Sequence, residues 1–419
     1  MCMEQIIIIG NGFDKACGLA SSYSDYFYSR FSEFEDKNQL VLPTIIDKID
    51  KGEEENILCS IWDILFAAFH DEGVPTPLWQ DVEAILAQWF TPTITVGKNH
   101  NFDSAISDWD HHFKDMHRTI EQQVQNTISN KTVEWTLAKY IKHKHPIQKV
   151  HTEGQRSSDL NLDDLNYKTE RSHFLNELPK YFLEELYIFE QSFAIYLLNC
   201  IEKSNDYYQK ADFLYKEICC TDTGTPLSKQ KNSVISFNYT TPLLKSTNDE
   251  IRNSIYLQRN IHGTLPEEKP KKQPDGSYIP SANIVFGVDG YLNRNNPRLE
   301  GFTKTHRILR IPRQELPDEM KGRHIFDMTN LHSIKIYGHS LGEADYSYFQ
   351  SLFDKIDLYN SNTLLYFLYS KKYETSPETV ESLINRYAQT LPAEKGRILM
   401  HKLLFEDRLK IMPISNKHN

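Results

Sequence analysis

The fold is decided by the stretch Ile6-Ile7-Ile8-Ile9-Gly10-Asn11-Gly12. Its four isoleucines form a β-branched run without polar alternation, which is typical of a strand buried on both faces, as in a parallel sheet. The glycines end this strand, and we expect a loop through Gly18 to follow. Ser22 and Asp25 stand three residues apart and predict a capping box that opens an aromatic helix.

Further from this stretch, short apolar runs return after residue 230 and alternate with helical patterns. The strand-like runs are 234–237, 255–257 with 260–261, 284–286, 334–337 and 363–369. Helices are expected to start near Asp345 and to span about 376–390. The alternation predicts an α/β fold with a Rossmann-like parallel sheet.

The segment 38–230 has a different pattern, because its apolar residues recur at helical spacing and strand signals are sparse. Ile57, Ile61, Leu65 and Phe69 are one such series. We therefore predict a Rossmann domain formed by residues 1–37 and 231–419, interrupted by a helical insertion over 38–230. Within the insertion, the polar stretch 143–159 is expected to be an exposed loop.

Composition excludes several classes of protein. The charges of the 419 residues sum to 47 − 57 = −10, which argues against a protein that coats nucleic acid or an anionic membrane. No apolar stretch approaches the ~18 residues of a membrane-spanning helix, and the N-terminus lacks a basic region of a secretion signal. Six scattered cysteines without a C-x-x-C pair suit a reducing cytoplasm. A cytoplasmic protein without membrane or nucleic-acid partners is expected.

Four short segments that follow predicted strands carry residues suited to ligand binding. The candidates are Gly10, Asn11, Gly12, Phe13, Asp14, Asn238, His262, Gly338, His339, Ser340 and Asp345. Glycine-rich turns let backbone amides approach a diphosphate, and polar side chains at the carboxyl ends of strands lie where open α/β sheets bind ligands. Each residue also has a structural alternative: a tight turn without ligand, a turn cap for Asn238, a structural role for His262, and a helix N-cap for Asp345.

Taken in order, these segments resemble the motifs of the sirtuin NAD-binding fold. Residues 10–19 are similar to the opening G-A-G-x-S-x-x-x-G-I, and 236–240 to the T-Q-N-x-D segment. Residues 262–264 match the H-G that carries the sirtuin base, 284–287 resemble the I-V-x-F-G strand, and 338–341 resemble the late G-T-S-L. The order of the five motifs is specific, although each motif alone is not.

A closer resemblance is to the AbiH abortive-infection family of bacterial anti-phage proteins, which looks like a remote sirtuin-like branch. It is carried by GNGFD, Ser-Tyr-Ser-Asp at 22–25, FNYT, IHG, FGVD and GHSLGEAD. The similarity covers residues 1–35, 232–292 and 330–372, whereas the helical insertion matches only in character. The resemblance implies an anti-phage defence protein. A phage-derived trigger protein and a second copy of the chain in a homo-oligomer are the partners that we expect for it.

Departures from the sirtuin pattern change what is expected. The zinc-binding cysteines and an obvious acyl-lysine channel are missing, so protein deacetylation is not expected. Asp14 replaces a small hydroxyl residue, and Thr240 replaces an acid. A carboxylate at position 14 would repel a diphosphate unless it faces the ribose or nicotinamide, or caps a backbone amide.

The resemblance implies hydrolysis of NAD at the nicotinamide–ribose bond. This bond joins the ribose to a cationic leaving group, so its cleavage needs little acid assistance and passes through an oxocarbenium-like state. Asn238 and His262 are the expected catalytic residues, with Asn238 orienting ribose or water and His262 accepting a proton. The amides of residues 10–13, with Ser340, would anchor the diphosphate and ribose. No metal ion is required.

Two other classes of function remain open at this stage. The same pocket could bind NAD or ADP-ribose without turnover, as a sensor or scaffold in a phage-defence complex. A nuclease or nucleic-acid effector is disfavoured by the net charge and by the lack of an ordered carboxylate cluster for two metal ions. A group of acidic and histidine residues within 108–117 is interpreted as a solvated helix face.

Overall fold

The computed structural model describes residues 2–35, 41–51, 60–71, 162–274, 276–288, 297–342, 345–370 and 375–414. The chain forms two compact units. The first, the sheet unit, comprises residues 1–26, 193–292 and 304–419. The second, the helical unit, comprises residues 27–192 and 293–303.

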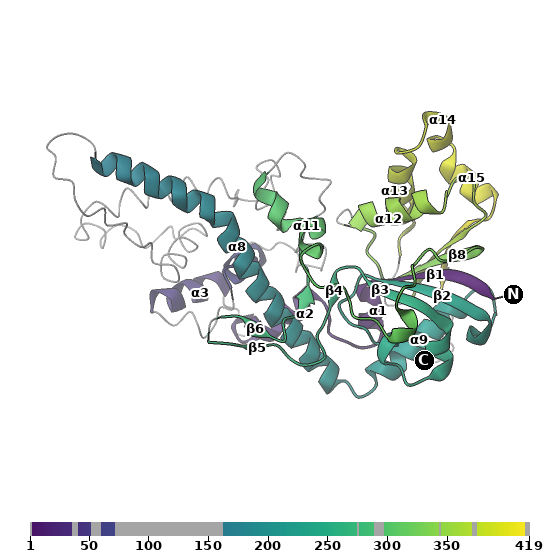
Figure 1. Ribbon diagram of the computed structural model, residues 1–419, viewed down its shortest axis with the longest axis horizontal. Helices are drawn as coiled ribbons and strands as arrows, with labels where there is room; N and C mark the ends of the chain where they lie inside the picture. The colour runs from purple at the N-terminus through teal and green to yellow at the C-terminus, as the bar shows by residue number, and fades with distance from the viewer. Residues whose placement is uncertain are drawn as a thin grey trace. The chain divides into compact units, whose positions relative to one another are not determined.

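A six-stranded parallel sheet forms the centre of the sheet unit (Figure 1). Its strands are β1 (Met3–Ile9), β2 (Gln230–Ser236), β3 (Ile255–Asn260), β8 (Leu331–Tyr337), β9 (Leu364–Tyr369) and β10 (Leu409–Pro413). Their order is β10-β9-β8-β1-β2-β3, and every neighbouring pair is parallel. Numbered within the sheet, this is the order 3-2-1-4-5-6 of a doubly wound dinucleotide-binding fold. The predicted α/β class with a Rossmann-like parallel sheet is confirmed.

The isoleucine run of β1 is buried on both faces, as predicted. Ile7 and Ile9 belong to the hydrophobic core that includes α9, whereas Ile6 and Ile8 belong to the core on the other side. The first core is covered by α9 (Tyr207–Cys220) and α10 (Asp249–Ser254), and the second by α12 (Tyr346–Lys355), α13 (Pro377–Ala388) and α15 (Leu399–Phe405). Figure 1 shows α9 and α12 on opposite sides of the sheet.

The segment after β1 departs from the expectation in one respect. The predicted loop through Gly18 is wrong, because Asn11–Ala16 form a short helix, α1, directly after Gly10. The predicted capping box is confirmed: the Asp25 backbone N–H donates to Ser22 Oγ at 3.2 Å, and the Ser22 N–H donates to Asp25 Oδ2 at 3.0 Å. These bonds open α2 (Tyr23–Glu35).

The run 284–286 does not join the parallel sheet. Instead β7 (Asn283–Ile284) pairs antiparallel with β4 (Gly263–Thr264). The expected strand at this position is therefore wrong as part of the main sheet, because the chain turns back at Gly263 after β3. A second small ribbon pairs β5 (Lys271–Lys272) with β6 (Tyr278–Ile279). The helix α11 (Lys304–Ile308) and the short α14 (Ala393–Gly396) complete the α-helices of the sheet unit as described.

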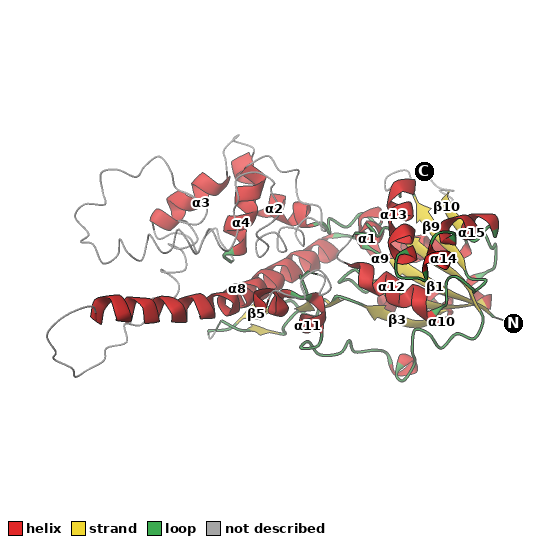
Figure 2. Ribbon diagram, turned by 90° about the horizontal axis from the view of Figure 1, so that it is seen from above, coloured by secondary structure: helices red, strands yellow, loops and turns green. Residues whose placement is uncertain are grey.

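The described parts of the helical unit are helices and connecting turns (Figure 2). They comprise α3 (Val41–Asp50), α4 (Trp62–Asp71), a 3-10 turn (Pro297–Phe302) and α8 (Leu162–Lys203) up to Ser192. Trp62 anchors α4 on α8, since its indole N–H donates to the Phe182 carbonyl at 3.0 Å. The predicted loop 143–159 and the acidic and histidine group within 108–117 lie outside the described residues.

The division into units differs from the expected boundaries at 37 and 231, since residues 193–230 lie in the sheet unit. Helix α9 is held there by a buried lysine. Lys335 of β8 donates to the carbonyl oxygens of Cys219 at 2.6 Å and of Thr221 at 2.9 Å, which caps the carboxyl end of α9. Burial lowers the pKa of Lys335 to about 8.

Candidate functional site at the carboxyl edge of the sheet

The strands that precede the candidate residues end level with one another. Ile9, the last residue of β1, pairs with Ser236 of β2 on one side and with Tyr337 of β8 on the other. Ser236 in turn pairs with Asn260, the last residue of β3. The four candidate segments therefore leave the sheet at its carboxyl edge. The junction of β1 and β8 is where the strand order reverses, which is where such sheets bind ligands.

The turns after β1 and β8 pack backbone against backbone. The Gly12 N–H donates to the Gly338 carbonyl at 2.8 Å. Gly338 has a φ of +68°, and a Cβ placed there would lie 2.5 Å from the Phe13 nitrogen. A Cβ at Gly12 would lie 2.6 Å from the Gly338 Cα. The glycines of both motifs are thus required for this close approach of the two turns.

Three backbone amides of the Gly10–Asp14 segment already have hydrogen-bond partners inside the chain. The Gly10 N–H donates to the Tyr337 carbonyl at 3.1 Å, the Phe13 N–H donates to the Gly10 carbonyl at 2.9 Å, and the Gly12 N–H is used as described above. The Asn11 side-chain oxygen accepts from the Ser21 hydroxyl at 2.5 Å. The three backbone amides are thus used in the packing of the turn. This geometry gives no support to the prediction that they anchor a diphosphate.

Asp14 is a fully enclosed carboxyl group. Its Oδ1 accepts from the Tyr207 hydroxyl at 2.8 Å, and its Oδ2 accepts from the Thr240 hydroxyl at 2.7 Å. Burial raises the pKa of Asp14 to about 6, although hydrogen bonding from Thr240 and Tyr207 and the nearby Asn238 amide favour the ionised form. The two residues that depart from the sirtuin pattern, Asp14 and Thr240, are therefore direct hydrogen-bond partners.

Asn238 presents an unpartnered amide. Its side chain is buried, with 5% exposed, and neither Oδ1 nor Nδ2 makes a hydrogen bond of good geometry, although the amide lies close enough to the Asp14 carboxylate to favour its ionised form. Its backbone is fixed: the Asn260 side-chain amide donates to the Asn238 carbonyl at 2.7 Å and to the Thr240 carbonyl at 2.9 Å. A buried amide without partners costs about 1–3 kcal/mol, so such groups in native proteins call for an explanation such as a ligand.

His262 is held at the start of a tight turn. Gly263 follows it with a φ of +92°, and a Cβ at that position would lie 1.7 Å from the Asn283 carbonyl oxygen, so only glycine fits. The imidazole is 1% exposed and contacts the ring of Phe237 edge-on, with 5.4 Å between ring centroids. Neither ring nitrogen makes a hydrogen bond of good geometry, although Nε2 lies 3.1 Å from Asp345 Oδ1.

Asp345 gathers three nitrogen atoms around its carboxylate. Lys304 Nζ lies 2.7 Å from Oδ1, beside His262 Nε2, and His339 Nε2 lies 3.4 Å from Oδ2. His339 Nδ1 accepts from the Leu341 N–H at 2.9 Å, so its proton resides on Nε2 and faces Asp345. Although Asp345 stands at the N-cap position of α12, its side chain makes no capping hydrogen bond.

The charges of this cluster follow from burial and contact. Burial acts to raise the pKa of Asp345, but the Lys304 ammonium and His262 hold it well below its usual range. Burial and the charge of Lys304 lower the pKa of His262, which the Asp345 carboxylate opposes. At neutral pH the cluster therefore holds an ionised Asp345, a charged Lys304 and a neutral His262 that is able to accept a proton.

The candidate residues form two groups in the structure, and residues of one group come from segments far apart in the sequence. The structure joins His262, His339 and Asp345 in one side-chain cluster, and it places Asp14 with Thr240 beside Asn238. Ser340 is exposed, and its Oγ accepts from the Gly342 N–H at 3.4 Å. Lys304 and Tyr207 were missed by the sequence analysis, because neither stands in a recognisable motif or directly after a predicted strand.

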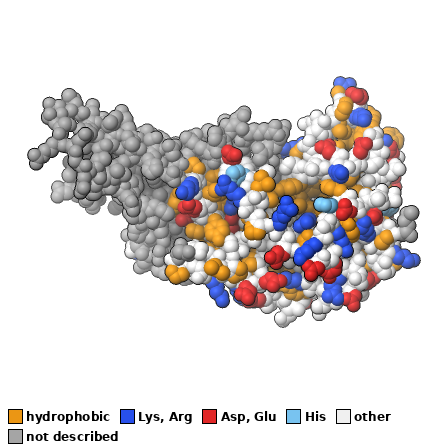
Figure 3. All heavy atoms as spheres, in the orientation of Figure 1, with side chains coloured by type: hydrophobic (Ala, Val, Ile, Leu, Met, Phe, Trp, Pro, Cys, Tyr) orange, Lys and Arg blue, Asp and Glu red, His pale blue; other side chains and the backbone are white. Residues whose placement is uncertain are grey.

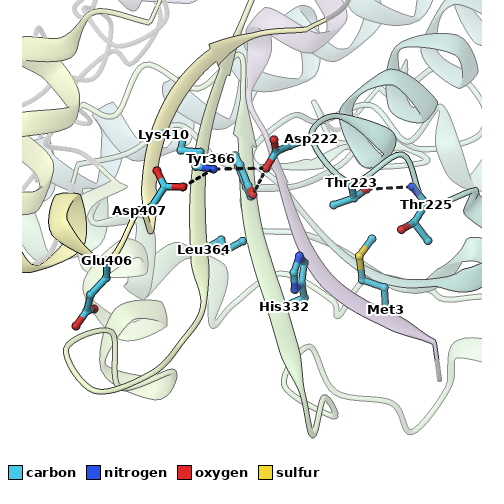
Figure 4. A pocket seen from close by; sticks show the side chains of 10 residues that line it. All are labelled: Met3, Asp222, Thr223, Thr225, His332, Leu364, Tyr366, Glu406, Asp407 and Lys410. Carbon is cyan, nitrogen blue, oxygen red and sulfur yellow. Dashed lines mark hydrogen bonds and ion pairs between the residues drawn. The ribbon is translucent and has the colours of Figure 1, made fainter.

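A hollow of about 470 Å³ lies at the opposite end of the sheet from the candidate residues (Figure 4). Met3, His332 and Leu364, at the amino ends of β1, β8 and β9, line it together with Asp222 and Lys410. None of the residues that the sequence singles out is among those lining it. Since parallel sheets bind ligands at their carboxyl ends, this hollow is not the candidate site.

Comparison with known proteins then identifies the chain. A family model described as "Bacteriophage abortive infection AbiH" matches residues 158–367, which is half of the chain. The chain belongs to the AbiH family. The matched segment includes Asn238, His262, Lys304 and Asp345, whereas the Gly10–Asp14 motif lies outside it. Neither the comparison with curated proteins nor that with solved structures gave a match.

Family membership makes this AbiH chain a phage abortive-infection defence protein. None of the helices in its described parts has the length and apolar character needed to cross a membrane. Among the same residues, no group of three or more His, Cys, Asp or Glu side chains is arranged to hold a metal ion. On the face drawn in Figure 3, basic and acidic side chains are interspersed over the described residues, so this face of the AbiH chain shows no continuous basic stripe.

Proposed function

We propose that this AbiH protein causes abortive infection by hydrolysing NAD at the nicotinamide–ribose bond. The observation that carries the proposal is the pair of buried polar groups at the carboxyl edge of a doubly wound sheet. Asn238 offers an amide without partners, and His262 offers a neutral imidazole with a free Nδ1. An amide can orient a ribose hydroxyl or a water molecule, and a neutral imidazole can accept a proton.

The reaction adds water across the bond between ribose C1′ and the nicotinamide nitrogen. The electron pair of that bond leaves with nicotinamide, the water oxygen bonds to C1′, and the released proton passes to His262. Positive charge develops on the ribose as the bond breaks. The Asp14 carboxylate, which is mostly ionised above its pKa of about 6, supplies negative charge close to Asn238.

The position of Asp14 supports an NAD orientation in which the diphosphate lies away from this carboxylate. Its carboxylate oxygens accept from Tyr207 of α9 and from Thr240 after β2. We therefore place the ribose and nicotinamide near Asp14 and Asn238. The diphosphate would lie toward the β1–β8 junction, where Ser340 is exposed. Sirtuin-like NAD binding is part of this proposal and rests on the motif order and the 3-2-1-4-5-6 strand order.

The purified full-length chain tests the proposal. NAD is incubated with wild type, Asn238→Ala and His262→Ala, and ADP-ribose and nicotinamide are quantified by liquid chromatography. Exposed residues of the same types provide matched controls, Asn360→Ala and His401→Ala. We expect hydrolysis by wild type and both controls, and a loss of about 10²-fold or more in the two site variants.

The same assay is run on infected cells, because a defence effector that consumed NAD without a trigger would kill its host. The proposal is contradicted if NAD remains intact in all conditions, or if both site variants hydrolyse as fast as wild type. Calorimetric binding of NAD or ADP-ribose without any turnover would instead support a sensor that uses this site for recognition alone.

A further inference from the structure

The carboxylate of Asp345 is the centre of a buried group of ionisable side chains that arrive from four segments. Lys304 begins α11, His262 follows β3, His339 follows β8, and Asp345 precedes α12. The side chains of Lys304, His262 and His339 are at most 3% exposed, and that of Asp345 is 13% exposed. Such burial makes the charges strongly dependent on one another.

Helix capping does not explain this arrangement, because the Asp345 side chain makes no capping hydrogen bond. Stability does not explain it either, since burying an ion pair costs desolvation energy that its attraction barely repays. Such a carboxylate can instead control a neighbouring histidine. When it is fixed by a lysine and faces one nitrogen of a buried imidazole, it selects the tautomer whose proton lies on that nitrogen.

We propose that Asp345, fixed by Lys304, is a positioning residue that holds His262 with its proton on Nε2 and leaves Nδ1 to accept a proton. Two distances support this role: Lys304 Nζ is 2.7 Å and His262 Nε2 is 3.1 Å from the same Oδ1, so Asp345 contacts the Nε2 side of the ring. Neither ring nitrogen makes a hydrogen bond of good geometry within the described chain, so Nδ1 is available to accept a proton. The inference rests on the proposed function only for the source of the proton, which is the attacking water.

The groups that face His262 determine how its protonation responds to substitution. Among the described residues, the charged side chains and the second imidazole that act on it are Lys304, Asp345 and His339, and the Tyr348 phenol is a further titratable neighbour. The rings of Phe237 and Tyr348 lie beside it, with centroids at 5.4 Å and 6.0 Å. Removing the Asp345 charge with Asp345→Asn should lower the pKa of His262 further. Removing the Lys304 charge with Lys304→Met should raise the pKa of His262.

Nuclear magnetic resonance of the histidine ring nitrogens tests the positioning without NAD. In wild type at pH 7.5 we expect the His262 signals of a neutral ring with a protonated Nε2 and an unprotonated Nδ1. In Asp345→Asn we expect the second tautomer to appear. A wild-type His262 with its proton on Nδ1, or with both tautomers equally populated, overturns the inference. This measurement stands even if a substituted chain fails to fold.

Kinetics of NAD hydrolysis provide the second test. We expect Asp345→Asn to lower kcat by at least about 10-fold, within the ~10²–10⁴-fold that a general base contributes, while KM changes little. Lys304→Met should move the acid limb of the kcat profile to higher pH, and Lys304→Arg should restore it. Asp354→Asn, which removes an exposed carboxylate from α12, should match wild type.

An unchanged kcat and acid limb in Asp345→Asn would overturn the positioning role. The two proposals fail in distinguishable ways. If wild type hydrolyses no NAD, the proposed function is lost while the tautomer measurement still decides the role of Asp345. If wild type hydrolyses NAD but His262 shows no tautomer preference, only the positioning inference is lost.

Discussion

At the scale of single residues, Asn238 and Asp14 are buried polar groups with opposite hydrogen-bond status. Both oxygens of Asp14 accept hydrogen bonds from hydroxyl groups, whereas both polar atoms of the Asn238 side chain lack partners. A folded protein that needed only stability would satisfy or replace such an amide. Asn238 is therefore expected to reduce stability in return for ligand binding, and substitution can separate the two effects.

Replacing Asn238 with leucine should stabilise the fold and abolish NAD hydrolysis. The free energy of unfolding should rise by roughly 1 kcal/mol, because an apolar group of similar size removes the unpaired amide. Asn232→Leu is the matched control, since Asn232 is also buried but donates to the Tyr215 hydroxyl at 3.0 Å. That control should lose about 1–3 kcal/mol. Urea unfolding measures both, and equal destabilisation of the two variants would contradict this interpretation.

The raised pKa of Asp14 should make the difference in free energy of unfolding between wild type and Asp14→Asn depend on pH. Asp14 has a pKa of about 6 in the folded protein, above the ordinary value of 3.8, so between these two pH values folded Asp14 binds a proton more tightly than unfolded Asp14 does. Wild-type stability should therefore rise relative to Asp14→Asn as the pH falls from 7.5 through 6 towards 4. The full change corresponds to about 3 kcal/mol.

The measurement is the difference in free energy of unfolding between the two proteins across this pH range. His262 and Asp345 titrate in both proteins, so their contributions cancel in the difference. A difference that stays constant with pH would show that the pKa of Asp14 is not raised in the folded protein.

At the scale of elements, the site depends on turns whose geometry admits only glycine. Gly263 and Gly224 both have positive φ angles, of 92° and 60°. A Cβ at Gly263 would lie 1.7 Å from a backbone oxygen, whereas a Cβ at Gly224 meets nothing within 4 Å. Comparing alanine substitutions at the two glycines therefore separates two contributions to the loss of stability. One is the free-energy cost of a left-handed backbone at a residue other than glycine, and the other is the cost of a steric clash between β4 and β7.

We expect Gly224→Ala to lower the free energy of unfolding by about 1–2 kcal/mol, the cost of the left-handed conformation alone. Gly263→Ala should cost at least ~2 kcal/mol more, because β7 must move away from β4. It should also reduce NAD hydrolysis by displacing His262. Thermal unfolding of both variants checks this. Equal losses of stability would show that the turn at Gly263 accommodates a Cβ by a small backbone movement, which would contradict the prediction.

Elements with strong local patterns were predictable from the sequence. The isoleucine run predicted β1, the Ser22–Asp25 spacing predicted the start of α2, and Ser376 predicted the start of α13, where its Oγ accepts from the Thr379 N–H at 3.2 Å. The run 284–286 was misassigned because a short apolar strand looks the same in a parallel sheet and in an antiparallel ribbon. Strand β10 was missed because Leu409–Pro413 mixes apolar residues with a lysine and a proline.

At the scale of the whole molecule, motif order predicted which segments meet, because parallel strands deliver their carboxyl ends to one edge. The sequence could not predict the partners of those segments. Lys304 reaches Asp345 from a segment without a motif, and Tyr207 reaches Asp14 from a helix assigned to the insertion. Such contacts depend on tertiary packing, which no local pattern records.

The central claim is that Asn238 and His262 act as a unit on one NAD molecule. The most direct measurement is NAD hydrolysis by wild type, Asn238→Ala, His262→Ala and the double variant in the same assay. The account predicts that the double variant is as active as the less active of the two single variants, because either substitution alone disables the unit. Losses that multiply in the double variant, or NAD hydrolysis that neither substitution affects, would contradict it.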